Sequence, residues 1–127
     1  TVLDDTYNAN PDSVIAAIDV LARAAGTKWL VLGDMGEVGA HGADFHAEVG
    51  RYARAAGIGR LFLLGELCTH AAAAFGAGAE HYGDIDALLA ALESGLGAGV
   101  TVLIKGSRFM RMERVVQALA GAQTGGH

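Results

Sequence analysis

Adjacent carboxylates, Asp4 and Asp5, follow a short apolar pair at the start of the chain and precede a polar stretch that ends at Pro11. At the end of a strand a carboxylate is suited to a ribose diol, a metal ion or an ammonium group, because it accepts two hydrogen bonds in a fixed geometry. The alternative role of each is to cap a turn. Asn8 and Asn10 carry amides that can bind an adenine or a ribose, although Asn10 is also explained as the N-cap of a helix that begins at Pro11.

A glycine-rich segment, Gly33-Asp-Met-Gly-Glu37, forms a second candidate site. Its glycines let the backbone approach a ligand closely, and Asp34 and Glu37 supply negative charge suited to an ammonium group. The alternative is a solvated loop without a ligand. Loops at strand ends often carry function, which favours the ligand site.

The acids and histidines that follow do not have the spacing of metal ligands. They are His41, Asp44, His46 and Glu48. None of them forms the pair of histidines at i and i+4 that is typical of a helical metal site, so we expect no metal and interpret His46 as a packed or capping residue. The single cysteine, Cys68, cannot form an internal disulfide and is expected to be a small buried hydrophobic residue, not a nucleophile. A lone cysteine fits a reducing cytoplasm.

Lys105-Gly-Ser-Arg108 places two cations and a hydroxyl after an apolar run. If a helix starts there, its free N–H groups and its dipole favour an anion, either a carboxylate or a phosphate. Solvated basic residues are the alternative. The sequence contains no Gly-Lys followed by Ser or Thr, so it has no P-loop, and any contact with a nucleotide is partial.

Short apolar runs alternate with helical apolar stripes along the chain. The predicted strands include Val2-Leu3 and residues 28–33, 60–65, 79–82 and 100–106, and the predicted helices cover residues 11–26, 45–57, 67–75, 84–96 and 109–119. The strands are continuous apolar runs, as in a parallel sheet that is covered on both faces. We therefore predict an α/β fold, a Rossmann-like open sheet that is mainly parallel, with about five strands alternating with helices on both faces.

The length of 127 residues fits one domain, which we expect to span residues 1–122 and to be followed by a flexible tail at 123–127. The net charge of −5 leaves no basic footprint, so we expect no nucleic-acid partner, and no apolar run is long enough to cross a membrane. Because Thr1 begins the chain within a predicted strand, we expect it to be cut from a longer protein. In such a sheet, ligands bind at the carboxyl ends of the strands, which nominates residues 4–10, 33–42, 65–66 and 105–108.

Across nearly its whole length the sequence resembles the C-terminal domain of the Mur ligases. The motifs that carry the resemblance are residues 4–13, residues 33–39 with His46 downstream, and residues 105–113. The resemblance is strongest to the members that join D-alanyl-D-alanine to a UDP-N-acetylmuramoyl-tripeptide in peptidoglycan synthesis. It implies an ATP-dependent cytoplasmic ligase in which ATP phosphorylates the tripeptide carboxylate and the dipeptide amine attacks the acyl phosphate.

The resemblance also implies that this chain alone is inactive. The P-loop and the Mg²⁺ ligands belong to a central domain against which this domain packs, and no catalytic or metal-binding residue is expected here. The last strand of the family's sheet lies between the first two, which would make Asp5 and Lys105 neighbours, and an extra antiparallel strand would precede Thr1. Gly42 departs from the serine-type cap expected before the second helix.

By position, the resemblance assigns Asp5 to the ATP ribose and Tyr7 and Asn8 to the region of the base and sugar, with Asn10 in the same nucleotide-binding stretch. The resemblance also suggests residues that bind the dipeptide. The carboxylate of the dipeptide would be bound by Lys105, Ser107 and Arg108, and the ammonium group of the dipeptide would face Asp34 and Glu37.

A phosphoacceptor receiver domain is the strongest alternative, since it also has paired aspartates after its first strand and a lysine after its fifth. A receiver needs an aspartate at the end of its third strand, where this chain has Leu64-Gly65-Glu66. A stand-alone nucleotide-binding module is the second alternative.

Overall fold

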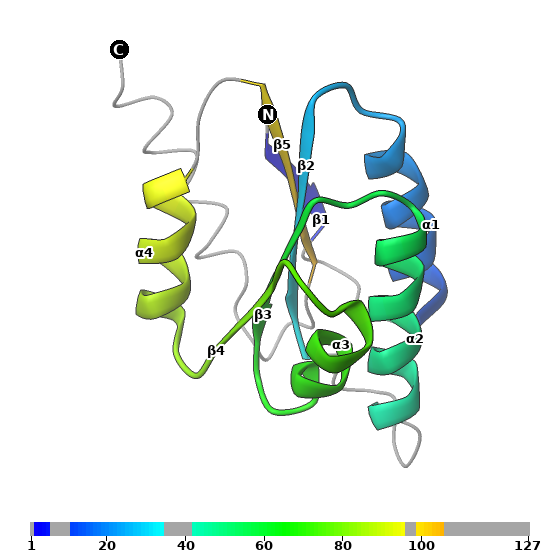
Figure 1. Cartoon of the computed structure of the whole chain (residues 1–127), viewed down its shortest axis with the longest axis vertical. Helices are drawn as coiled ribbons and strands as arrows, with labels where there is room; N and C mark the ends of the chain where they lie inside the picture. The colour runs from blue at the N-terminus through cyan, green and yellow to red at the C-terminus, as the bar shows by residue number, and fades with distance from the viewer. Residues whose placement is uncertain (1, 6–10, 35–41, 96–98, 106–127) are drawn as a thin grey trace.

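The computed structural model describes residues 2–5, 11–34, 42–95 and 99–105, in which strands and helices alternate (Figure 1). The strands are β1 (Val2–Asp5), β2 (Thr27–Gly33), β3 (Arg60–Leu64), β4 (Ala79–Tyr82) and β5 (Val100–Lys105). The helices are α1 (Pro11–Ala22), α2 (Gly42–Ala55), α3 (Cys68–Phe75) and α4 (Ile85–Gly95). The predicted closing helix at 109–119 and the tail at 123–127 lie outside the described residues.

The five strands form one sheet in the order β1-β5-β2-β3-β4, and all four neighbouring pairs are parallel. This confirms the predicted fold class and the position of the last strand between the first two. The register pairs Asp5 of β1 with Lys105 of β5, and Lys105 also pairs with Leu32 of β2. The carboxyl ends of these three strands therefore lie side by side.

Helices cover both faces of the sheet (Figure 1). The helices α1, α2 and α3 pack on one face, against Leu30 and Leu32 of β2, whereas α4 packs on the other face, against Val31 of the same strand. Successive side chains of a strand point to opposite faces, so a strand that is buried on both faces must be apolar at every position. This explains the continuous apolar runs at residues 28–33 and 60–65.

Glycines lie after the end of α1, at the start of α2 and in the contact between α2 and α3. The helix α1 ends at Ala22, four residues before the predicted end, and the chain turns into β2 at Gly26, whose φ of +80° disfavours other residues. The helix α2 starts at Gly42, three residues before the predicted start. On α2, a Cβ atom at Gly50 would lie 2.4 Å from the carbonyl oxygen of Ala71, so this glycine lets α2 and α3 pack closely.

None of the helices in the described residues is long and apolar enough to cross a membrane.

Candidate functional site

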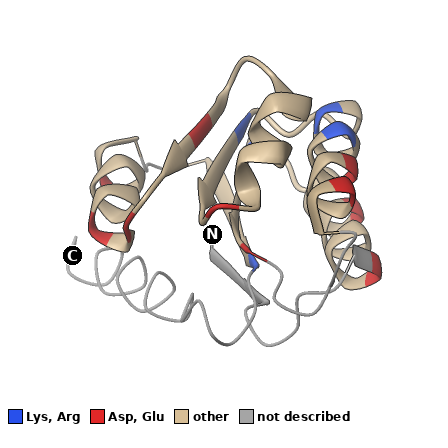
Figure 2. Ribbon diagram, turned by 90° about the horizontal axis from the view of Figure 1, so that it is seen from below, with Lys and Arg blue, Asp and Glu red and all other residues tan. Residues whose placement is uncertain are grey.

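The candidate site lies where β1, β5 and β2 end, at the edge of the sheet that Figure 2 views. Asp5 and Lys105 are directly paired across β1 and β5, so the acidic and the cationic motif meet at this edge, as predicted. Asp34 follows β2 at the same edge, and its backbone N–H donates to the Leu64 carbonyl of β3. The other predicted site residues, Tyr7, Asn8, Asn10, Glu37, Ser107 and Arg108, lie outside the described residues.

Lys105 is completely buried, which is uncommon for a lysine. Its Nζ donates a hydrogen bond of 3.3 Å to the Oγ atom of Ser13 in the first turn of α1. The bond joins the end of β5 to the start of the helix that follows the polar stretch after Asp5. Ser13 was not predicted as a site residue, since a serine in a first helical turn is ordinarily explained by the helix alone.

Asp34 caps a helix that is distant in sequence. Asp34 is buried, with 8% of the residue exposed, and its carboxylate accepts hydrogen bonds from the backbone N–H groups of Leu67 at 3.0 Å and of Cys68 at 2.9 Å. These N–H groups lie at the N-terminus of α3, where helical backbone donors have no partner within the helix. The negative charge also interacts favourably with the helix dipole. The predicted contact of Asp34 with an ammonium group stays a prediction.

Gly65 makes room for this carboxylate. Its φ of +114° lies in the region that favours glycine, and a Cβ atom there would lie 2.4 Å from the Cγ atom of Asp34. The glycine at the end of β3 is therefore required by both the backbone and the packing of Asp34.

His46 is completely buried in α2, as the sequence predicts for a packed residue. Its Nδ1 lies 2.6 Å from the carbonyl oxygen of Gly42, one turn earlier in the helix. A carbonyl oxygen only accepts, so Nδ1 carries a hydrogen and donates it. Burial lowers the pKa of His46, which favours the neutral ring with its lone pair on Nε2.

Cys68 is completely buried in the core at the start of α3, which confirms the prediction of a small buried residue. Its Sγ donates to the Leu32 carbonyl at 3.5 Å. Burial raises the pKa of the Cys68 thiol well above its usual value, and the neighbouring charge of Asp34 raises it further. A protonated thiol is a poor nucleophile, which agrees with the expectation that Cys68 performs no covalent chemistry.

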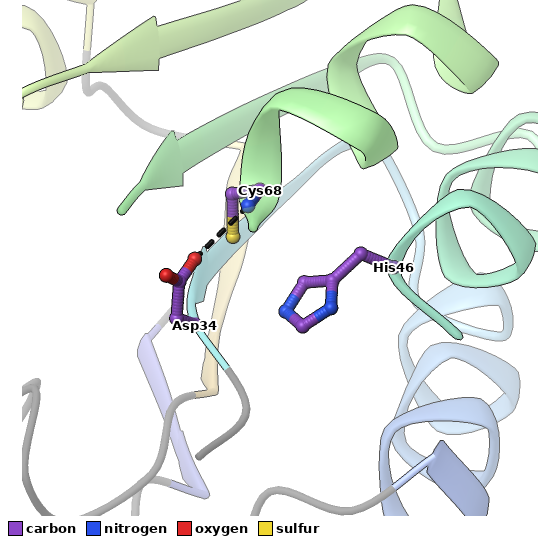
Figure 3. Close-up of side chains that lie close together, drawn as sticks. All are labelled: Asp34, His46 and Cys68. Atoms are coloured by element: carbon purple, nitrogen blue, oxygen red, sulfur yellow. Dashed lines mark hydrogen bonds between the residues drawn. The ribbon is translucent and has the colours of Figure 1, made fainter. Parts of the chain in front are cut away.

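Asp34, His46 and Cys68 come together to form a cluster that we call the buried triad (Figure 3). One carboxylate oxygen, one ring nitrogen and the sulfur all lie within 4.8 Å of one another. The three residues come from the end of β2, from α2 and from α3. Their separation in the sequence left no local spacing by which the triad could have been predicted.

The family model described as "Mur ligase, glutamate ligase domain" matches residues 1–108. The chain belongs to this Mur ligase family. The resemblance noted in the motifs is thereby confirmed over most of the sequence.

Several relatives of this Mur ligase domain are D-alanyl-D-alanine ligases by name. The chain is 44% identical over 120 residues to UDP-N-acetylmuramoyl-tripeptide–D-alanyl-D-alanine ligase of Escherichia coli K12, a match that covers 93% of this chain and 26% of that protein. Among solved structures, MurF of Acinetobacter baumannii is similar with a TM-score of 0.82 and 30% identity over 93% of this chain and 27% of that one. MurF ligase of Thermotoga maritima, in complex with ADP, is similar with a TM-score of 0.80 and 28% identity over 92% of this chain and 27% of that one.

The chain thus spans about a quarter of the length of these relatives.

The order of strands in the sheet excludes the receiver alternative. A receiver has the order 2-1-3-4-5, in which its first strand lies between its second and third. Among the described strands of this Mur ligase domain, β1 lies at one end of the order, and β5 separates it from β2.

Proposed function

We propose that this chain is the C-terminal domain of the ATP-dependent ligase that adds D-alanyl-D-alanine to UDP-N-acetylmuramoyl-tripeptide in peptidoglycan synthesis. The observation that carries the proposal is the placement of β5 between β1 and β2, which pairs Asp5 with Lys105 and so joins the nucleotide motif to the dipeptide motif. The names of the relatives support the choice of the tripeptide and the dipeptide as substrates. A cytoplasmic location stays a prediction from the lone cysteine.

The reaction requires activation, because a carboxylate does not react with an amine directly. ATP transfers its γ-phosphoryl group to the tripeptide carboxylate, and ADP leaves. The ammonium group of the dipeptide loses a proton, and the neutral amine attacks the acyl carbon. The C–O bond to phosphate then breaks, inorganic phosphate leaves, and the nitrogen loses a second proton as the amide forms. Holding the amine against the acyl phosphate is the contribution that a domain without a P-loop can make.

Mg²⁺ would neutralise phosphate charge in this reaction, and we assign its site to a part of the ligase outside this chain. In the part of the chain that the structure describes, the only group of three candidate ligands is the buried triad. It includes a thiol and an imidazole, whereas Mg²⁺ prefers oxygen ligands. No step of the reaction is therefore assigned to a magnesium ion held by these residues.

For the nucleotide, we assign Asp5 to the ribose and place Tyr7, Asn8 and Asn10 in the same binding stretch. A carboxylate can accept hydrogen bonds from both hydroxyls of a ribose. Asp5 ends β1 at the edge where ligands bind in open α/β sheets, which supports this role.

For the dipeptide, we assign Ser107 and Arg108 to its carboxylate and Glu37 to its ammonium group. Lys105 and Asp34, which the sequence analysis placed in the same two groups, are buried and hydrogen-bonded within the domain. We propose that they act mainly by anchoring the segments that follow them, since Lys105 precedes the Gly-Ser-Arg segment and Asp34 precedes Met-Gly-Glu.

Asp5→Asn and Arg108→Ala in the full-length ligase test this division of roles. We expect Asp5→Asn to raise the Michaelis constant for ATP about tenfold, because one charge-assisted hydrogen bond is weakened. The Michaelis constant for the dipeptide should change little. We expect Arg108→Ala chiefly to raise the Michaelis constant for D-alanyl-D-alanine. Steady-state phosphate release with each substrate varied in turn measures both constants.

Asp86→Asn, on the exposed first turn of α4, is the matched control and should change neither constant. The opposite assignment of the two variants would overturn the division of roles. Calorimetric titration of the 127-residue chain with ATP distinguishes the proposed ligase domain from a stand-alone nucleotide-binding module. Micromolar binding by the chain alone would favour a stand-alone nucleotide-binding module, whereas the proposed domain should bind ATP very weakly.

A further inference from the structure

The buried triad combines the donor atoms that zinc-class ions prefer. Thiolate sulfur, imidazole nitrogen and carboxylate oxygen are all ligands of Zn²⁺ and Co²⁺, and sulfur in particular disfavours Mg²⁺ and Ca²⁺. We propose that Asp34, His46 and Cys68 bind one transition-metal ion of the zinc class. Such a site takes no part in the chemical steps of the ligation and does not hold the Mg²⁺ of that reaction.

The spacing of the ligand atoms supports the proposal. In a tetrahedral zinc site with metal–ligand bonds of about 2.0–2.3 Å, ligand atoms lie about 3.3–3.8 Å apart. The three ligand atoms of the triad lie within 4.8 Å of one another, so closure around an ion shortens their separations by at most about 1.5 Å.

His46 has the orientation of a metal ligand. Its Nδ1 donates to the Gly42 carbonyl, which leaves the lone pair on Nε2, and Figure 3 shows this side of the ring directed toward Asp34 and Cys68. Histidines that bind metals characteristically donate their other nitrogen to a carbonyl or a carboxylate, which fixes the ring. The bond to Gly42 is a contact of this kind.

The other two ligands are held in place by α3. The Asp34 carboxylate is fixed by the N–H groups of Leu67 and Cys68. The close approach of α2 to α3 at Gly50, one turn after His46, brings the imidazole toward Cys68. The ligand geometry is therefore set by backbone contacts that exist before an ion binds.

The charge balance also fits a buried site. Metal binding breaks the S–H bond of Cys68, forms a metal–sulfur bond and releases the proton to solvent. The divalent ion is then neutralised by one thiolate and one carboxylate, with the imidazole neutral. A neutral complex avoids the large cost of an uncompensated charge in the core.

Titration of the reduced 127-residue chain with Co²⁺ tests the proposal. We expect one equivalent to produce a thiolate-to-cobalt charge-transfer band in the near ultraviolet together with the intense visible bands of a four-coordinate ion. Zn²⁺ should displace the cobalt and abolish both signals, whereas excess Mg²⁺ should leave them unchanged. Metal binding should also raise the melting temperature, because the ion binds the folded state.

Cys68→Ser should abolish the charge-transfer band, and His46→Gln should weaken Co²⁺ binding by about 100-fold or more, since loss of a ligand exceeds the usual effect of a second-shell change. His70→Gln, an exposed histidine of the same helix α3, is the matched control and should bind as the parent does. Far-ultraviolet circular dichroism verifies that each variant is folded.

The proposal is overturned if no charge-transfer band develops, or if the band persists in Cys68→Ser. Equal weakening by His70→Gln and His46→Gln would also overturn it, because an adventitious surface ion would then account for the binding. Because Cys68→Ser and His46→Gln alter different elements, misfolding of one variant leaves the other to decide.

Discussion

Two buried polar sites lie at the same edge of the sheet but differ in what their charges do. At one, the cation of Lys105 donates to the neutral hydroxyl of Ser13 and joins β5 to α1. At the other, the anion of Asp34 satisfies two backbone donors at the start of α3. Burying a charge is unfavourable in both places. Asp34 offsets that cost through the helix terminus it caps, so we expect it to stabilise the fold, whereas we expect Lys105 to act mainly through the segment that follows it.

Asp34→Ala should produce the largest effect on stability. The substitution leaves two amide donors at the buried start of α3 without their acceptor and opens a small cavity, so we expect a loss of about 4 kcal/mol in the free energy of unfolding. Urea denaturation of the chain measures this loss. Glu48→Ala, an exposed acid on α2, is the control and should change stability by less than about 0.5 kcal/mol. An effect of Asp34→Ala as small as that of the control would remove the distinction between the two sites.

Gly65→Ala should also destabilise the domain, because Gly65 lies against the Asp34 carboxylate. We expect a cost of about 3 kcal/mol, from the strain of a positive φ together with the contact of the new Cβ with the Asp34 carboxylate. Gly57→Ala separates these two causes, because Gly57 has a φ of +86° but no atom within 4 Å of an added Cβ. It should cost only about 1 kcal/mol, from the backbone alone. Equal costs for the two variants in urea denaturation would mean that the carboxylate moves aside.

The fold was predictable from the sequence because its strands and helices have distinct periods. The apolar runs at 28–33 and 60–65 indicated strands covered on both faces, and the structure places them at the centre of a parallel sheet. Helix ends were less predictable, since α1 stops at Ala22 although its apolar stripe continues to Ala25. The pairing of Asp5 with Lys105 required the family resemblance, because alternation of strands and helices does not determine the order of strands.

The buried triad could not be predicted, and the reason is physical. Local spacing identifies ligands on one helix, whereas Asp34, His46 and Cys68 lie on three elements that only tertiary packing brings together. The capping role of Asp34 could not be predicted for a similar reason. From the sequence, a carboxylate that follows a strand looks like a ligand-binding residue whether or not it caps a distant helix. The sequence held only indirect signs of this packing, namely Gly50 and Gly65. At each position the absence of a side chain allows a neighbouring element to approach closely.

Lys105→Met should have the smallest effect on stability and so tests the comparison most directly. Methionine occupies a similar volume and removes the cost of burying an ammonium group, so we expect the free energy of unfolding to change by less than about 1 kcal/mol. In the full-length ligase, however, kcat/KM for the dipeptide should fall more than about tenfold, because the segment that carries Arg108 loses its anchor. Lys28→Met, near the opposite end of the neighbouring strand β2, should leave activity unchanged. A large loss of stability with Lys105→Met would make Lys105 a structural residue like Asp34, whereas stability and activity that are both unchanged would deny it either role.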